Sequence, residues 1–283
     1  MTPEVDWEQV HEVCPEAVAC FVRRRDVLGL ELRGGARVSL KFHRQRSVEY
    51  LAALQEVQEH LWRHGYPCPR PLGVRGHATL EEWREDGVHR DAHEPAIRRV
   101  LARELVRLTR LTRGVRPSVD LEPYLPRAGG PLWPPDDPDV RVEWIDEIAG
   151  AARAQRDAGG GDVVLAHHDW TVGHFRFQEL RPSAVYDWDS LSVGYEPVFA
   201  GEAAAYFTYT EELEVDPWPS VDETFLFIDD YARARNGPFS KDEHATAAAA
   251  AVYARACATR RVLAGGGDAT ALDLPEYAAA LLK

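Results

Sequence analysis

Two groups of acidic residues each follow a short apolar run with the composition of a β-strand. Asp169 comes after the run 163–166, and Asp187 and Asp189 come after the run 184–186. Carboxylates that emerge from neighbouring strand ends suit phosphoryl transfer from a complex of Mg²⁺ with a nucleotide. One would orient an attacking hydroxyl and accept its proton, while the others would hold the metal that neutralises charge on the phosphates. The two groups therefore predict a phosphoryl-transfer site.

Three histidines around Asp169 permit a second interpretation. His167, His168 and His174 could be ligands of a transition metal in a metallohydrolase, together with the aspartate. Such sites normally draw further histidines from later strands, but the next histidine along the chain is His244, in an Ala-rich run. The metallohydrolase is therefore the less favoured hypothesis.

The segment 167–174 resembles the H-G-D-x-x-x-x-N catalytic loop of aminoglycoside phosphotransferases and choline-kinase-like enzymes, which are relatives of protein kinases. In this resemblance His167 takes the histidine position and Asp169 takes the place of the catalytic aspartate. Asp187 matches the Mg²⁺-binding aspartate of the family's I-D-[FWY] motif, and Asp189 is an additional candidate metal ligand. The resemblance covers residues 18–207 and implies transfer of the γ-phosphoryl group of ATP or GTP to a hydroxyl.

Two upstream residues fit the same resemblance. Lys41 lies in the alternating run 37–42, whose apolar side chains share one face and leave the lysine on the other. The family lysine contacts the α- and β-phosphates, which implies that role for Lys41. Glu56, in the helical run that follows, would be its ion-pair partner, with Glu59 and then Glu49 as alternatives.

His174 departs from the family pattern, because it stands where the family has a metal-binding asparagine. A neutral histidine offers nitrogen, whereas Mg²⁺ prefers oxygen ligands. The replacement leaves open a weakened second metal site, a site for a different ion, or direct contact of His174 with phosphate. It also leaves open a pseudokinase that binds ligand without turnover. We predict Asp187, His174 and Asp189 as the metal ligands.

The elements that carry these residues follow the order β-β-β-α-β-β and then become helical. Predicted strands and the one early helix lie at 17–22, 27–32, 37–42, 47–64 (helix), 72–75 and 78–83. Ser47 is the predicted N-cap of that helix. With the resemblance, this order predicts an α+β, bilobal, protein-kinase-like fold. A small β-rich N-lobe with one main helix would comprise residues 1–84, and a larger, mostly helical C-lobe would comprise residues 85–283.

Composition restricts the partners and the compartment. A net charge of −13 argues against nucleic acid, whose binding needs basic clusters. No apolar run approaches the roughly 20 residues that cross a bilayer, and residues 1–9 lack the apolar core of a secretory signal. The four cysteines have no metal-ligand spacing and are expected to be reduced. We therefore expect a cytoplasmic protein without membrane or nucleic-acid partners, and we predict no oligomeric state.

The substrate is expected to be a small polar molecule. A cluster of acidic residues with one tryptophan lies where the family has substrate-binding helices: Glu211, Glu212, Glu214, Asp216, Trp218, Asp222 and Glu223. It would suit a cationic antibiotic, although a solvated acidic loop explains it equally well. The predicted function is therefore a small-molecule O-phosphotransferase with an antibiotic-like substrate. A kinase for choline, homoserine or a sugar is the close alternative.

Overall fold

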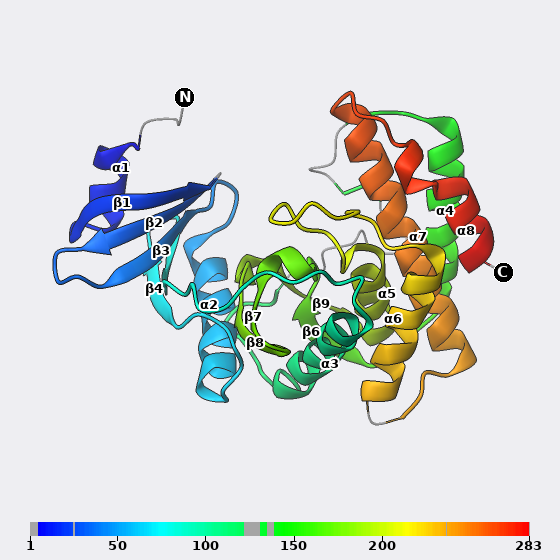
Figure 1. The fold of residues 1–283 in the computed structure, drawn as a ribbon, viewed down its shortest axis with the longest axis horizontal. Coiled ribbons are helices and arrows are strands. Elements are labelled where there is room, and N and C mark those ends of the chain that lie inside the picture. The colour runs from blue at the N-terminus through cyan, green and yellow to red at the C-terminus, as the bar shows by residue number, and fades with distance from the viewer. Residues whose placement is uncertain (1–4, 25, 122–130, 135–138, 236, 283) are drawn as a thin grey trace.

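The computed structural model describes residues 5–24, 26–121, 131–134, 139–235 and 237–282. Its N-terminal part is an antiparallel five-stranded sheet in the order β1-β2-β3-β5-β4 (Figure 1). The strands are β1 (Ala17–Arg24), β2 (Val27–Leu32), β3 (Arg37–Phe42), β4 (Pro71–Arg75) and β5 (Ala78–Glu82). All five agree closely with the predicted runs. The strand that carries Lys41, β3, is the central one.

Two helices accompany this sheet. The predicted helix is α2 (Val48–Arg63), and Ser47 is its N-cap as expected, because its side chain accepts a hydrogen bond from the Tyr50 backbone N–H. A short helix that was not predicted, α1 (Trp7–Val13), precedes the sheet and is capped by Asp6. Its Val10 is buried in the core under the sheet, and Trp7 and Val13 pack against that core, so apolar contacts hold the helix in place.

The remaining described residues are mostly helical, with four short strands in two pairs. The helices are α3 (Pro95–Leu111), α4 (Glu143–Ala158), α5 (Glu196–Tyr206), α6 (Val221–Ala234), α7 (Lys241–Ala264) and α8 (Leu274–Leu281). The strands are β6 (Val163–His167), β7 (Phe175–Gln178), β8 (Arg181–Val185) and β9 (Leu191–Tyr195). Figure 1 shows the sheet at one end of the molecule and the helices at the other. The predicted α+β class, with an N-terminal sheet and a helical C-terminal part, is confirmed.

Strands β7 and β9 were not predicted, yet they position the chemistry. β7 pairs with β8 as a hairpin that buries Phe175 and Phe177. β9 pairs antiparallel with β6, so that His167 lies opposite Leu191. The two hairpin-like pairs therefore bring the segment after β6, which contains Asp169, beside the segment after β8, which contains Asp187.

Helices α5 and α7 approach each other closely through small residues. A Cβ atom placed on Gly201 of α5 would lie 2.0 Å from the carbonyl oxygen of Ala247 in α7. Real Cβ atoms cannot come so near a backbone oxygen, so a larger side chain would force the helices apart. Gly201 therefore sets the spacing of two central helices of the C-terminal part.

Gly201→Ala is expected to lower the free energy of unfolding by at least about 1–3 kcal/mol, because the added methyl meets a rigid backbone. The matched control is Gly150→Ala in α4, where an added Cβ meets nothing within 4 Å. That variant should gain about 0.5–1 kcal/mol from helix propensity. Denaturant unfolding of both variants measures the difference. Equal stabilities would contradict the close contact.

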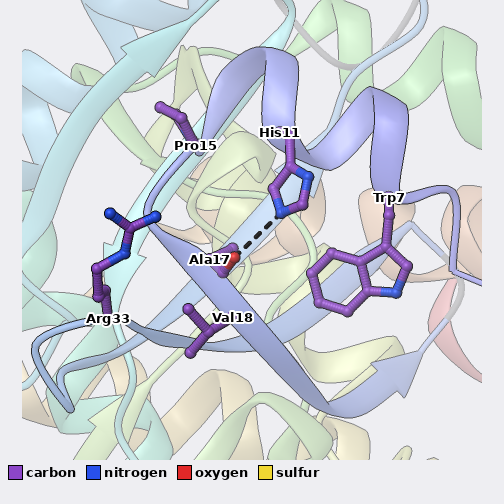
Figure 2. Close-up of a pocket in the computed structure, with 6 residues that line it drawn as sticks. All are labelled: Trp7, His11, Pro15, Ala17, Val18 and Arg33. Carbon is purple, nitrogen blue, oxygen red and sulfur yellow. Dashed lines mark hydrogen bonds between the residues drawn. The ribbon is translucent and has the colours of Figure 1, made fainter.

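None of the described helices is long and apolar enough to cross a membrane. A hollow of about 480 Å³ lies beside α1 and the first residues of β1, lined by Trp7, His11, Pro15, Ala17, Val18 and Arg33 (Figure 2). Within it His11 Nε2 lies 3.1 Å from the carbonyl oxygen of Ala17. None of the predicted site residues lines this hollow.

Candidate active site

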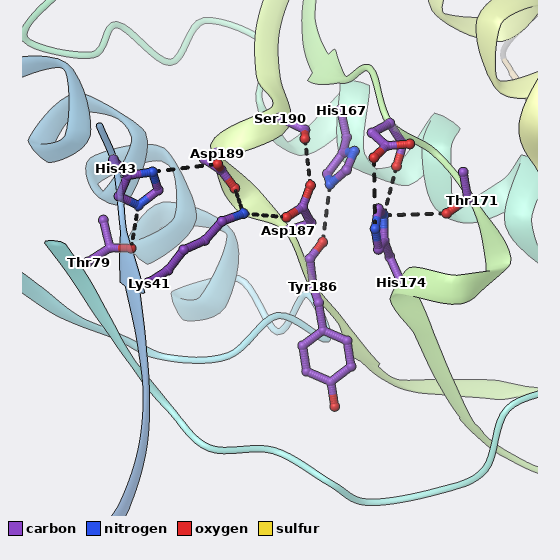
Figure 3. A network of polar contacts seen from close by, with 11 residues as sticks. Lys41, His43, Thr79, His167, Thr171, His174, Tyr186, Asp187, Asp189 and Ser190 are labelled. Carbon is purple, nitrogen blue, oxygen red and sulfur yellow. Dashed lines mark hydrogen bonds and ion pairs between the residues drawn. The ribbon is translucent and has the colours of Figure 1, made fainter. Parts of the chain in front are cut away.

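Lys41 joins the sheet to two aspartates, Asp187 and Asp189, that follow β8. Its Nζ lies 2.6 Å from Oδ1 of Asp187 and 2.5 Å from Oδ1 of Asp189 (Figure 3). Although burial lowers the pKa of the Lys41 ammonium, the two carboxylates outweigh it and raise the pKa above its usual value. Residues 146 positions apart in the sequence thus form one charged centre.

Asp187 is held in an unusual backbone conformation. Its φ of 68° and ψ of 45° are left-handed, a conformation that aspartate tolerates better than most residues. Its Oδ2 accepts a hydrogen bond of 2.7 Å from the Ser190 hydroxyl. Burial raises the pKa of the Asp187 carboxyl, but the charge of Lys41 opposes this and holds the pKa well below its usual range. Asp187 is therefore ionised and can act as an anionic ligand.

The loop after β6 presents Asp169 beside this centre. Trp170, which is 1% exposed, anchors the loop by donating a hydrogen bond from Nε1 to the Leu101 carbonyl oxygen. The Asp169 side chain is 47% exposed, and its Oδ2 lies 3.8 Å from Nε2 of His174. A carboxylate so exposed on an anchored loop can meet a substrate hydroxyl, which is what a general base requires.

His167 and His174 lie between the two aspartates. His167 Nε2 is 3.1 Å from the Tyr186 carbonyl oxygen, and His174 Nδ1 is 3.0 Å from the Asp169 carbonyl oxygen. Burial lowers the pKa of His167 to about 4, so its ring is neutral at neutral pH. Ligand atoms of His167, His174 and Asp187 all lie within 4.8 Å of one another. The three residues can therefore hold a metal ion.

The predicted metal set is only partly brought together. Asp187 and His174 belong to the group of three possible metal ligands, but Asp189 has other contacts. Its Oδ1 pairs with Lys41, and its Oδ2 lies 3.6 Å from Nδ1 of His43. Among the described residues, His168 is not part of that group either. Asp169 lies outside the group as well, so the metallohydrolase ligand set loses His168 and Asp169 and keeps His167 and His174.

The predicted ion pair between Lys41 and Glu56 is wrong. Within the described part of the chain, Lys41 pairs with the two aspartates, while exposed Glu56 accepts a hydrogen bond of 2.8 Å from the Ser118 backbone N–H. The alternative, Glu59, pairs with Arg63 on its own helix. The reason is the rotation of α2, whose buried face carries Gln55 and Gln58 and turns Glu56 outward.

Sequence reasoning missed three residues around the site. Ser190 and His43 contact Asp187 and Asp189, and both lie within three positions of a predicted residue, which was the available signal. The third, Glu202 in α5, is 3% exposed, and its Oε1 has no hydrogen-bond partner among the described residues. Burial is the main cause that raises the pKa of Glu202 to about 8; the charge of Arg156 opposes the rise, and the charge of Asp169 adds to it. Nothing in the sequence pattern marks this position.

The raised pKa of Glu202 predicts a pH-dependent stability. The folded state retains a proton on Glu202 that the unfolded chain releases at the usual carboxyl pKa. The stabilisation that results from the raised pKa is therefore complete at low pH. It declines as the pH rises toward about 8, the folded-state pKa. Wild-type stability should fall by up to about 1.4 kcal/mol per pH unit over that window.

Glu202→Gln keeps the shape and removes the ionisation, so thermal melts of the variant should lack this decline. The exposed Glu147→Gln, in α4, is the matched control and should follow the wild type. The assignment would be refuted if the melting profiles of wild type and Glu202→Gln ran parallel between pH 5 and pH 8.

The cluster of acidic residues predicted to bind substrate lies in the acidic segment (residues 207–223), which begins next to the loop that contains Asp169. Backbone N–H groups of Val172 and Gly173 donate to the carbonyl oxygens of Phe207 and Tyr209. Farther along the segment, Glu212 pairs with Arg24 at the end of β1. Part of the acidic cluster therefore has a structural role. The segment also extends from the Asp169 loop to the sheet.

A second structural contact ties the far end of the acidic segment to α6. His93 Nδ1 lies 2.6 Å from Oε1 of Glu223, and His93 Nε2 lies 2.9 Å from the Asp216 carbonyl oxygen. Glu223 also forms the capping box with Ser220 that begins α6. Glu223 is thus occupied in fixing the segment, whereas Glu211 and Glu214 are exposed, and Glu211 accepts a hydrogen bond of 3.2 Å from the Tyr209 hydroxyl.

Comparison with known proteins gives a family match. The family model described as the phosphotransferase enzyme family matches residues 26–196. No curated protein sequence matches the chain.

Solved structures match over nearly the whole chain. The amicoumacin kinase hAmiN, in complex with AMP-PNP, Ca²⁺ and Ami, has a TM-score of 0.67 at 12% identity, covering 98% of this chain and 92% of that one. An aminoglycoside phosphotransferase from Alicyclobacillus acidocaldarius has a TM-score of 0.61 at 10% identity, covering 100% and 95%. Choline kinase LicA from Streptococcus pneumoniae has a TM-score of 0.58 at 10% identity, covering 97% and 96%. At these identities the likeness shows the fold.

Proposed function

The chain belongs to the phosphotransferase enzyme family, and from that premise we propose that it transfers the γ-phosphoryl group of ATP or GTP to a hydroxyl of a polar, cationic, antibiotic-like molecule. The observation that carries this proposal is the convergence of Lys41, Asp187 and the Asp169 loop from three separate strands. These are an ammonium group, a metal-binding carboxylate and an accessible base, the parts that phosphoryl transfer uses.

In the proposed mechanism each residue has one task. Asp169 accepts the proton of the substrate hydroxyl as the hydroxyl oxygen attacks phosphorus. Lys41 binds the nucleotide phosphates, exchanging one of its two carboxylate partners for phosphate oxygens. A divalent cation held by Asp187 would neutralise charge on those phosphates. Most of the rate enhancement would come from positioning and charge neutralisation.

The cationic substrate class is supported by the acidic segment. It starts at the two backbone contacts with residues 172 and 173, so a molecule bound to it would lie within reach of Asp169. Carboxylates attract a cationic substrate over several ångströms and a nearby aromatic ring can bind it by a cation–π contact. The amicoumacin kinase structure, solved with a nucleotide analogue, supports an antibiotic substrate by analogy. Because nucleoside triphosphates are supplied in the cytoplasm, the proposal sets the enzyme there.

The test is mass-spectrometric detection of a phosphorylated product. The protein is incubated with ATP, GTP, Mg²⁺ and Mn²⁺ and with a panel of cationic antibiotics, neutral sugars, choline and homoserine. A cationic antibiotic that gains one phosphoryl group, with no product in Asp169→Asn, is expected. Phosphorylation of choline, homoserine or a sugar alone would replace the substrate class and keep the reaction. Nucleotide binding without any product would favour the non-catalytic, pseudokinase-like alternative.

A further inference from the structure

We propose that His167, His174 and Asp187 form a two-histidine, one-carboxylate site that binds a divalent transition-metal ion in preference to Mg²⁺. The inference deepens the proposed function, because Asp187 is the residue through which a cation would reach the nucleotide. It replaces Asp189, in the ligand set predicted from the sequence, by His167. Figure 3 shows the two rings beside the Asp187 carboxylate.

His167 is the first line of evidence. Its Nε2 lies 3.1 Å from the Tyr186 carbonyl oxygen, and because a carbonyl can only accept, Nε2 carries the hydrogen. Nδ1 therefore bears a lone pair. The side chain is 1% exposed, and among the described residues nothing donates a hydrogen bond to Nδ1. A buried acceptor without a partner is costly, and a metal ion would satisfy it.

His174 repeats this arrangement with the opposite nitrogen. Its Nδ1 is 3.0 Å from the Asp169 carbonyl oxygen, so Nδ1 carries the hydrogen and Nε2 bears the lone pair. Oδ2 of Asp169 lies 3.8 Å from Nε2, beyond hydrogen-bond distance. In metal centres a ligating histidine normally donates its other N–H to a carbonyl or carboxylate, which fixes the ring. Both histidines already have that outer contact.

The third ligand and the spacing complete the site. Asp187 offers a carboxylate whose Oδ1 accepts a hydrogen bond from Lys41 and whose Oδ2 accepts one from Ser190. Each oxygen keeps a further lone pair for a metal ion. One nitrogen of each imidazole ring and one carboxylate oxygen of Asp187 lie within 4.8 Å of one another. Metal–ligand bonds of about 2.0–2.2 Å would bring them somewhat closer together. The three side chains come from β6, η1 (Val172–His174) and the segment after β8, so the site depends on the folded chain.

The donor set decides which ion is preferred. Mg²⁺ is a hard cation that takes oxygen ligands in near-octahedral geometry. Two imidazoles with one carboxylate are typical of sites for divalent ions from manganese to zinc. Where an asparagine would offer oxygen, His174 offers nitrogen, and His167 adds a second nitrogen. The preference should therefore shift from Mg²⁺ toward ions such as Mn²⁺, Co²⁺ and Zn²⁺.

Co²⁺ is the probe for the first experiment, because its visible absorption reports its ligands and needs no turnover. The nucleotide-free wild-type protein is titrated with Co²⁺, and then Mg²⁺ in large excess or Zn²⁺ is added. We expect one Co²⁺ per chain, displaced by Zn²⁺ and retained against Mg²⁺. His174→Asn should weaken Co²⁺ binding at least about 10-fold and restore sensitivity to Mg²⁺. The exposed His64→Asn is the matched control and should bind Co²⁺ like the wild type.

Because His167 is buried, its own variant could fail to fold, so ¹⁵N NMR of histidine-labelled wild type tests it instead. Zn²⁺ should shift Nδ1 of His167 and Nε2 of His174, leaving the other nitrogen of each ring as N–H. Absence of a saturable Co²⁺ site, displacement by Mg²⁺, or unshifted His167 resonances would overturn the inference. A phosphorylated product formed with Mg²⁺ would still leave the proposed function standing. Conversely, Co²⁺ binding without any product would count against the function alone.

Discussion

Asp169→Asn is expected to lower kcat for phosphoryl transfer by about 10²- to 10⁴-fold, the usual contribution of a general base. Asparagine keeps the size of the side chain but cannot accept the hydroxyl proton. Nucleotide affinity should change little, because Lys41 and Asp187 remain in place and Asp169 is not among the contacts of either. Single-turnover rates at saturating nucleotide and substrate measure the loss.

The same substitution should leave the fold intact. The loop is anchored by buried Trp170, and His174 contacts the backbone carbonyl of residue 169, which the substitution retains. Asp229→Asn, a half-exposed position in α6, is the matched control and should keep full activity. If Asp169→Asn retained more than about a tenth of the wild-type kcat, proton transfer would have to be assigned to another group.

The location of the site could be predicted because each of its parts lies on a short element with a clear pattern. Alternation along β3 fixed the face of Lys41, and apolar runs before Asp169 and Asp187 marked β6 and β8. The order of these elements, together with the family resemblance, was enough to predict the α+β fold that the structure confirms. The placement of a side chain that is fixed by one strand and the loop after it could therefore be predicted from the sequence.

The partner of Lys41 could not be predicted in the same way, because it depends on how a helix is rotated against the sheet. The apolar stripe of α2 already placed Glu56 on the opposite face, with Leu51, Leu54 and Leu61 buried. Resemblance to the family outweighed that periodicity in the prediction, and the periodicity was correct. At a helix position, the phase of the buried face is the stronger evidence for where a side chain points.

Other features of the site arise only from tertiary contacts. The free lone pair on Nδ1 of His167 depends on where the Tyr186 carbonyl lies, 19 residues farther along the chain. The burial of Glu202 depends on how α5 packs against α6 and α7. No local pattern carries either fact, since both residues look ordinary in the sequence. The first bears directly on the metal chemistry proposed for the site, and the second on the pH dependence of stability.

Lys41→Met is expected to lower kcat/KM for the nucleotide by about 10²- to 10³-fold, because it removes the ammonium group that we propose binds the phosphates. It should also destabilise the protein. The Asp187 and Asp189 carboxylates, each about a quarter exposed, would lose the cation that now lies between them. Because solvent partly screens these carboxylates, the free energy of unfolding should fall by about 1–2 kcal/mol, less than the cost of breaking a fully buried ion pair.

A divalent cation should restore part of that stability, which separates this effect from simple misfolding. In Lys41→Met the two carboxylates repel each other, so a bound cation gains more there than in the wild type, and melting temperature should rise further on its addition. Lys241→Met, at the exposed start of α7, removes another of the chain's few lysines and is the matched control. Thermal melts of both variants, with and without Mn²⁺, measure the difference. If Mn²⁺ raised the melting temperature of the two variants equally, Lys41 and the metal ion would not share Asp187. Only a shared carboxylate makes the loss of the Lys41 ammonium strengthen the binding of the metal ion.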